Sequence, residues 1–158
     1  MDSPLDVQVD GAHYKTLKVQ PIEFAMVNGL DPCAFSILKY VTRHRSKHGA
    51  QDIEKADHFR RLRVHQLPVA VDGMQTRLER TMAFLGLAPG ARIERLLTLG
   101  PVVWIITPET YCEENGITGE DRLAVLSLGR WVEGHCLAET DLQFNLKALR
   151  LAYEETDA

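Results

Sequence analysis

The sequence predicts a mostly α-helical protein, in which a helical hairpin is followed by a helical C-terminal part with at most a minor strand. Two amphipathic segments, over about residues 32–47 and 51–64, are joined by a short turn that contains Gly49. Capped amphipathic segments joined by a tight turn are typical of a helical hairpin. Most of the remaining chain also shows the apolar spacing of helices.

Start and stop residues define the N-terminal elements. Pro21 suits the first turn of a helix and Gly29 can end it, so a short helix is expected between them. Asp31 followed by a proline predicts the N-cap of the first hairpin helix. Gly49 then separates this helix from the second helix of the hairpin.

The C-terminal half is predicted to contain helices interrupted by one extended segment. A linker over residues 67–73 comes first. β-branched residues favour a strand at 101–107, and Pro, Asn and Gly favour a loop at 108–118. The predicted helices cover about residues 74–86, 91–99, 118–136 and 140–153. In the last of them, the residues with helical spacing are Leu142, Leu146, Leu149 and Tyr153.

Composition limits the class of protein. The chain has 158 residues and a mass of 17.8 kDa, with 45% hydrophobic and 25% charged residues. These values suit one globular domain, or a small domain with a large extension. There is no apolar stretch long enough to span a bilayer, and the N-terminus does not resemble a signal peptide. Three cysteines without a Cys-x-x-Cys motif suit a reducing compartment, so we expect a cytoplasmic protein.

Charge is distributed unevenly along the chain. The net charge is −4, yet residues 39–63 contain eight basic and three acidic residues, which leaves −9 on the rest. Five of the six histidines lie within the first 65 residues. This basic, histidine-rich segment in an acidic protein indicates a localised anionic ligand, although a solvated helical face gives the same pattern.

The basic residues have a spacing that suits phosphate. Lys39, Arg43 and Lys47 recur every four residues and would share one helix face. The following helix begins near Asp52 and Lys55, and its N-terminus adds free backbone N–H groups. Together these groups predict a site for a phosphate-bearing ligand.

Other sites are not supported by motifs. The chain lacks the glycine-rich phosphate loop G-x-x-x-x-G-K-[ST] and the dinucleotide motif G-x-G-x-x-G. His44 and His48 have the spacing of a helical zinc site, but basic residues surround them and no acidic third ligand is near in sequence, so no metal site is predicted. Trp104 and Trp131 are expected in the core rather than as platforms for bases.

At these residues the chain resembles a small phage family, long described as a domain of unknown function, which includes the nucleotide kinase of bacteriophage T7. The resemblance covers about residues 13–62. Its pieces are an HY pair, a P-I-E segment, an I-K-Y-x-x-R-x-x-x-K-like helix and a D-x-x-K-A segment, which here are residues 13–14, 21–23, 37–47 and 52–56. Where the family has Gly-Asn, this chain has Phe35-Ser36.

The resemblance implies a phage nucleotide-binding protein that acts as a kinase of deoxynucleoside monophosphates without a P-loop. Residues 1–65 would form the signature region. The resemblance does not reach residues 66–158, whose pattern predicts a helical extension, for oligomerisation, specificity or partner binding, packed with the signature region as one globular unit. The residues implied in phosphoryl transfer are Lys39, Arg43 and Asp52. Those implied in nucleotide or phosphate binding are His13, Tyr14, Lys39, Tyr40, Arg43, Lys47 and Lys55.

The role of Asp52 is left open between a base and a carboxylate that orients the phosphate or Lys55. The phosphate donor would be a nucleoside triphosphate, no other cofactor is assigned, and a need for Mg²⁺ is left open. The expected partners are nucleotides and further copies of the chain, through the last helix, rather than a membrane or nucleic acid. Arg43→Ala should weaken nucleotide binding more than Arg63→Ala, because Arg63 is expected to point to water.

Two alternatives stay open. One is a non-catalytic nucleotide sensor or sequestering protein that counters a host defence signal, for which the Phe35-Ser36 replacement speaks. The other is a module that binds a host protein or nucleic acid through residues 39–63. A long polyanion would bind with a steep dependence on salt, whereas a nucleotide in a closed site would be less sensitive.

Overall fold

In the computed structural model, residues 5, 13–65, 104–135 and 137–156 are described. This part of the chain contains helices and no strand, so the prediction of a mostly α fold is confirmed. The helices are α1 (Pro21–Asn28), α2 (Pro32–Arg43), the 3₁₀ helix η2 (His44–Ser46), a helix over residues 50–65, α5 (Pro108–Glu114), α6 (Gly119–Val132) and α7 (Ala138–Thr156).

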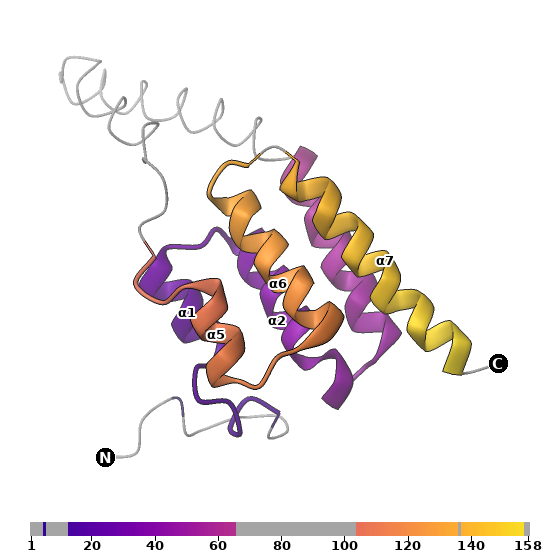
Figure 1. Ribbon diagram of the computed structural model, residues 1–158, viewed down its shortest axis with the longest axis horizontal. Coiled ribbons are helices and arrows are strands. Elements are labelled where there is room, and N and C mark those ends of the chain that lie inside the picture. Colours follow the sequence, from indigo (N-terminus) through magenta and orange to yellow (C-terminus); the bar gives the residue numbers. More distant parts are fainter. Residues whose placement is uncertain (1–4, 6–12, 66–103, 136, 157–158) are drawn as a thin grey trace, which may run out of the picture.

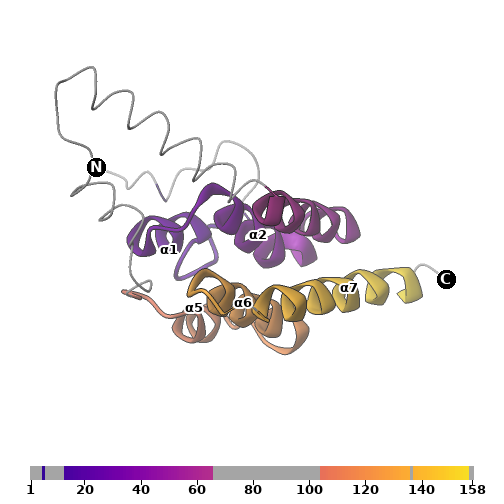
Figure 2. The same cartoon turned by 90° about the horizontal axis from the view of Figure 1, so that it is seen from above.

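The helices form two layers (Figure 1). Figure 2 shows α1, α2 and the helix over 50–65 in one layer, with α5, α6 and α7 in the other. The core lies between them and draws on both. Buried residues such as Ile37, Leu38 and Ile53 pack in one cluster with Leu142 and Leu146. The N-terminal hairpin therefore shares its core with the C-terminal helices.

The predicted hairpin is present, with one difference at its turn. The Asp31 side chain accepts hydrogen bonds from the backbone N–H groups of Cys33 and Ala34, as an N-cap does. The α-helix ends at Arg43 rather than near residue 47, because the chain tightens into η2. Gly49 then adopts a positive φ of 52°, which a residue with a side chain rarely adopts, and the next helix begins.

The loop predicted over residues 108–118 is wrong, and the strand candidate over 101–107, of which at most a minor strand was expected, is absent from its described residues 104–107. Residues 104–107 form no strand, because the Asn28 side chain takes over their backbone bonding. Its amide oxygen accepts from the N–H groups of Ile105 and Ile106, and its amide nitrogen donates to the Ile106 carbonyl. The expected loop at 108–118 contains α5, whose N-cap is Thr107.

The last two helices agree with the sequence apart from their ends. α6 ends at Val132, before Gly134, whereas the prediction extended to about residue 136. α7 buries Leu142, Leu146 and Leu149 in the core of the single chain. The predicted linker at 67–73, the helices at 74–86 and 91–99, and residues 101–103 lie outside the described residues. No helix in the described part is both long and apolar enough to cross a membrane.

Candidate functional site

Three cations surround the ring of Tyr40. Two come from α2 and one from the helix over 50–65, so the turn of the hairpin brings them together. The Lys39 ammonium and the Arg43 guanidinium each lie 4.8 Å from the ring centroid, and the Lys55 ammonium lies 5.7 Å from it. Phe59 of the helix over 50–65 stacks on Tyr40, with 5.9 Å between the ring centroids. We call Lys39, Tyr40, Arg43, Asp52 and Lys55 the Tyr40 cluster.

Asp52 anchors this cluster. Its side chain is fully buried and accepts two hydrogen bonds from Arg43, Nε to Oδ2 at 2.9 Å and Nη2 to Oδ1 at 3.1 Å. The Lys55 ammonium lies 3.6 Å from Oδ1. Burial by itself would raise the pKa of Asp52, but the Arg43 hydrogen bonds and charge, helped by Lys55 and His48, hold that pKa below its usual range. Asp52 is therefore ionised and a weak base.

An aromatic wall adjoins the Tyr40 cluster. Tyr14 lies close to Arg43. Burial raises the pKa of the Tyr14 hydroxyl above its usual value, and the nearby Arg43 charge offsets only part of this rise. His13 packs edge-on against Tyr14, with 4.4 Å between the ring centroids. Beside them is a small cavity of about 60 Å³, lined by Tyr14, Gln20, Pro21, Ile22, Phe35 and Lys39. The site thus offers cations next to an apolar recess.

The prediction that Lys39, Arg43 and Lys47 share one helix face is wrong for Lys47. Lys47 lies beyond η2, in the turn before the helix over 50–65, because α2 ends at Arg43. Lys39 and Arg43 keep their shared face and meet over Tyr40. In the same helix, the Ser36 hydroxyl donates to the Pro32 carbonyl at 2.8 Å, so Ser36 is used within its own helix.

Arg63 does not point to water. Its side chain is 9% exposed, and its Nε donates to Asp31 Oδ2 at 2.8 Å. The expectation failed because the end of the helix over 50–65 packs against α6, where the Arg63 guanidinium lies over the Trp131 ring. Arg63 is a structural residue and cannot serve as a solvated control for Arg43.

The sequence did not reveal a second polar network, formed by His44, Arg45, Asp121 and Tyr153. The His44 ring is 1% exposed, and it contacts the Tyr153 hydroxyl through Nδ1 at 2.7 Å and Asp121 Oδ1 through Nε2 at 3.1 Å. Arg45 donates to the same carboxylate at 2.6 and 3.1 Å. A signal was present, since His44 continues the apolar spacing of Ile37 and Val41.

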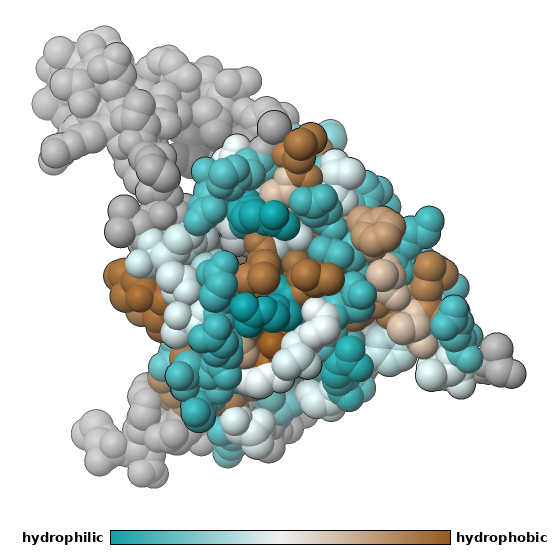
Figure 3. Space-filling view, in the orientation of Figure 1, coloured by the Kyte–Doolittle hydropathy of each residue, from teal (hydrophilic) through white to brown (hydrophobic). Residues whose placement is uncertain are grey.

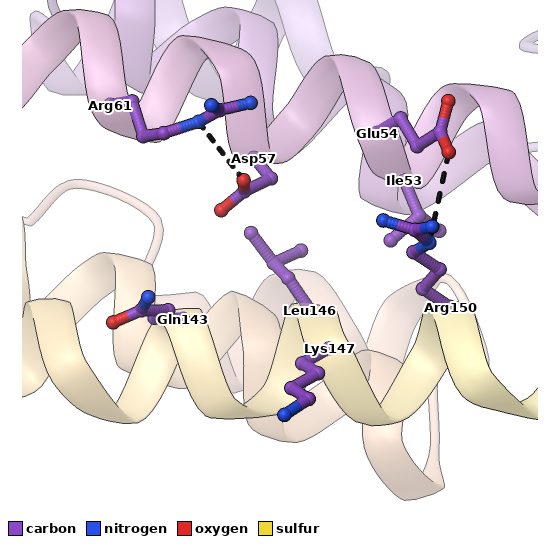
Figure 4. A pocket seen from close by; sticks show the side chains of 8 residues that line it. All are labelled: Ile53, Glu54, Asp57, Arg61, Gln143, Leu146, Lys147 and Arg150. Carbon is purple, nitrogen blue, oxygen red and sulfur yellow. Dashed lines mark ion pairs between the residues drawn. The ribbon is translucent and has the colours of Figure 1, made fainter.

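A groove of about 480 Å³ lies between the helix over 50–65 and α7 (Figure 4). Its basic residues are mostly paired. Arg61 contacts Asp57 at 3.1 Å, and Arg150 lies 3.7 Å from Glu54. Lys147 points away from the opposite helix in Figure 4. The groove therefore has less free positive charge to offer an anion than the Tyr40 cluster.

The described residues contain no group of three or more side chains that could hold a metal ion. Cys33 is partly buried and Cys112 buried, both as free thiols, and burial raises the pKa of Cys112 to about 11. Trp104 and Trp131 pack against the core, as expected. The positive charges of Lys39, Arg43 and Lys55 give the Tyr40 cluster the means to bind and neutralise an anion.

Residues 9–61 match the family model described as a protein of unknown function, DUF3310. This match takes in about a third of the chain, including α1, α2 and most of the helix over 50–65. It therefore contains the whole Tyr40 cluster, while Asp121 and Tyr153 lie outside it. No curated protein and no solved structure matches the chain.

Proposed function

We propose that this protein binds a nucleoside monophosphate at the Tyr40 cluster. The observation that carries the proposal is the charge of the cluster. Lys39, Arg43 and Lys55 supply three positive charges, and the buried Asp52 removes one. The remaining charge of +2 matches a phosphate monoester, which carries about −1.5 to −2 at neutral pH. One phosphate group would neutralise the cluster.

The hydrogen-bonding capacity of Arg43 supports this assignment. A guanidinium has five N–H donors, and Asp52 takes two of them. Tyr14 is a further hydrogen-bond partner of Arg43, which leaves at most two donors for phosphate oxygens, while Asp52 holds the guanidinium in a set orientation. The recess beside Lys39, with Tyr14 and Phe35, has a volume of only about 60 Å³ and would contact one edge of the nucleobase rather than enclose the nucleoside. His13 would close the site behind Tyr14.

Kinase activity is the finer part of the proposal and depends on the resemblance to the phage family of the T7 nucleotide kinase. The attacking oxygen of a monophosphate is already ionised, so phosphoryl transfer to it needs positioned charge rather than a strong base. Asp52 would then act by orienting Arg43. Lys39 would neutralise charge on the transferring group, and Lys47 in the adjacent turn would help hold the triphosphate donor. The protein would act in a phage-infected cell.

A second candidate is a nucleotide-binding protein without catalysis, which would sequester a signal nucleotide. Two observations favour it. Phe35 lines the apolar recess where the family has glycine, and Ser36 bonds within α2 where the family has an asparagine amide. The chain thus lacks a bifunctional amide at this point of the site. This candidate shares the binding site and differs in turnover.

A nucleotide panel separates the candidates. Thermal shift and calorimetry would be measured for nucleoside mono-, di- and triphosphates, and transfer of phosphate from ATP or GTP would be followed by chromatography, with and without Mg²⁺. A kinase binds a monophosphate and forms the diphosphate. A sequestering protein binds without turnover. No binding of any nucleotide, with a steeply salt-dependent affinity for DNA or RNA, would overturn both in favour of a nucleic-acid module.

Matched variants locate the site. Lys39→Ala should raise the dissociation constant for the monophosphate about tenfold or more, because a desolvated charge-assisted contact contributes about 1.5–3 kcal/mol. Lys147→Ala removes the same charge from the groove in Figure 4 and should have little effect. Arg43→Ala is compared with Arg130→Ala, whose side chain is 55% exposed. A larger effect of Lys147→Ala would move the ligand to the groove.

A further inference from the structure

His44 joins Asp121 of α6 to Tyr153 of α7 through hydrogen bonds of its two ring nitrogens. The Asp121 carboxylate accepts hydrogen bonds from both His44 and Arg45. Burial by itself would raise the pKa of Asp121, but these two partners hold that pKa below its usual value. The carboxylate is therefore ionised and can only accept hydrogen bonds. His44 therefore donates from Nε2 to Asp121, and its Nδ1 shares a hydrogen bond with the Tyr153 hydroxyl. The chain of contacts runs from α6 through η2 to α7.

Tyr153 also touches the turn of the hairpin. A Cβ placed on Gly49 would lie 3.2 Å from Tyr153 Cε1, so the ring lies directly against this glycine. The Gly49 N–H donates to the His44 carbonyl at 2.9 Å, and the Asp52 N–H donates to the Gly49 carbonyl at 3.0 Å. The turn that carries Lys47 and leads into Asp52 is thus held by backbone bonds on one side and by Tyr153 on the other.

We propose that Tyr153 is a positioning residue of the nucleotide site, which extends the function proposed above and rests on it. By clamping Gly49 and His44, Tyr153 holds the turn over residues 47–49 and the first turn of the following helix, where Asp52 orients Arg43. The helix α7 lies outside the segment matched by the family model, so this part of the chain would complete a site whose ligand-binding groups all come from the matched segment.

The expected effect follows from the population of the competent turn. Without the hydroxyl bond the turn opens more often, and an apparent dissociation constant rises in proportion to the loss of the competent form. Losing one hydrogen bond, worth about 1 kcal/mol, should raise the dissociation constant for a nucleoside monophosphate by up to about fivefold, and the full factor applies when the turn is mostly open without ligand. The test variant is Tyr153→Phe, which keeps the ring against Gly49.

Tyr111→Phe is the matched control. It also removes a tyrosine hydroxyl that bonds to the hairpin, in this case to Thr42 Oγ1 at 2.9 Å, but Tyr111 contacts α2 rather than the turn. Both variants would be assayed by calorimetry well below their unfolding temperatures. Amide hydrogen exchange by mass spectrometry supplies a readout that does not need the ligand. Tyr153→Phe should speed exchange of the amides of residues 49–53, whereas Tyr111→Phe should not.

Each result decides between the ideas. An affinity weaker by up to about fivefold, together with faster exchange at residues 49–53, both confined to Tyr153→Phe, supports the positioning role. Unchanged affinity and exchange in Tyr153→Phe, while Lys39→Ala still weakens binding about tenfold or more, overturns this role and leaves the proposed function standing. If the wild-type protein binds no nucleotide, the proposed function fails, and faster exchange alone would then show only a structural brace, which also overturns the proposal.

Discussion

The guanidinium group of Arg63 lies over the ring of Trp131, with 4.2 Å between its central carbon and the ring centroid. The same group donates to Asp31, the residue that caps α2. One buried arginine therefore joins three elements: the end of the helix over 50–65, the start of α2 and the end of α6. The hairpin is held at this open end, while Arg43 and Asp52 hold it near its turn.

Arg63→Ala should lower the free energy of unfolding by about 2–3 kcal/mol, because it removes a stacked cation and leaves Asp31 without its ion pair. Arg61→Ala is the control, since the Arg61 side chain is 65% exposed and its pair with Asp57 is worth at most about 1 kcal/mol. Urea unfolding followed by circular dichroism measures both. Equal losses in the two variants would contradict the assigned role of Arg63.

Asp52→Asn should change how stability depends on pH. The pKa of Asp52 is lowered in the folded protein, so its carboxylate stabilises the fold above about pH 4, its unfolded pKa, and this contribution disappears as the pH falls toward the lower folded value. The variant should be less stable by about 1–3 kcal/mol at pH 7. The difference from the wild type should shrink below pH 4 in urea titrations, and a constant difference down to pH 2.5 would refute the assignment.

Gly129→Ala should destabilise the protein, although alanine favours a helix. A Cβ at this position would lie 2.5 Å from Pro108 Cγ, so α5 and α6 must separate. Overpacking of this kind costs about 1–3 kcal/mol. The double variant with Pro108→Ala removes the obstructing atom and should recover much of the loss. An additive result in this double-mutant cycle would show that the contact between residues 108 and 129 is not the cause.

Any homo-oligomer that forms through the last helix, as predicted, would use the exposed face of α7. The core already buries Leu142, Leu146 and Leu149. The exposed apolar residues of the helix include Phe144, which is 70% exposed, and Leu151, which is 44% exposed. Figure 3 shows apolar side chains along the outer side of this helix. Phe144→Glu should therefore reduce the molar mass measured by light scattering at micromolar concentration. A wild-type protein that is already monomeric would end this prediction.

Local rules were enough to locate most of the helices. The Asp31 cap, the stop at Gly29 and the turn at Gly49 each depend on a few neighbouring residues, and all three are present. The strand expected at 104–107 is absent because the backbone there bonds to the side chain of Asn28, which lies 77 or 78 positions away in the sequence. Patterns of β-branched residues contain no information on such a distant partner.

The part of the candidate site that depends on spacing within the hairpin was also predictable from the sequence. Lys39, Arg43, Asp52 and Lys55 lie on two helices joined by a short turn, so sequence spacing alone brings them near each other. The central place of Tyr40 and the burial of Asp52 depend on packing between the helices. The contacts of Arg63 and His44 depend on α6 and α7, which lie far along the chain. Spacing within the hairpin could not reveal them.

The shared core also affects how the chain folds during synthesis. Leu146 leaves the ribosome about 90 residues after Ile53, which it covers in the finished protein. At about 5–20 residues per second, this delay lasts roughly 5–20 s. During that time the apolar sides of α2 and the helix over 50–65 have no C-terminal layer to cover them. A chain truncated before α6 would therefore keep these apolar sides exposed and should be prone to aggregate.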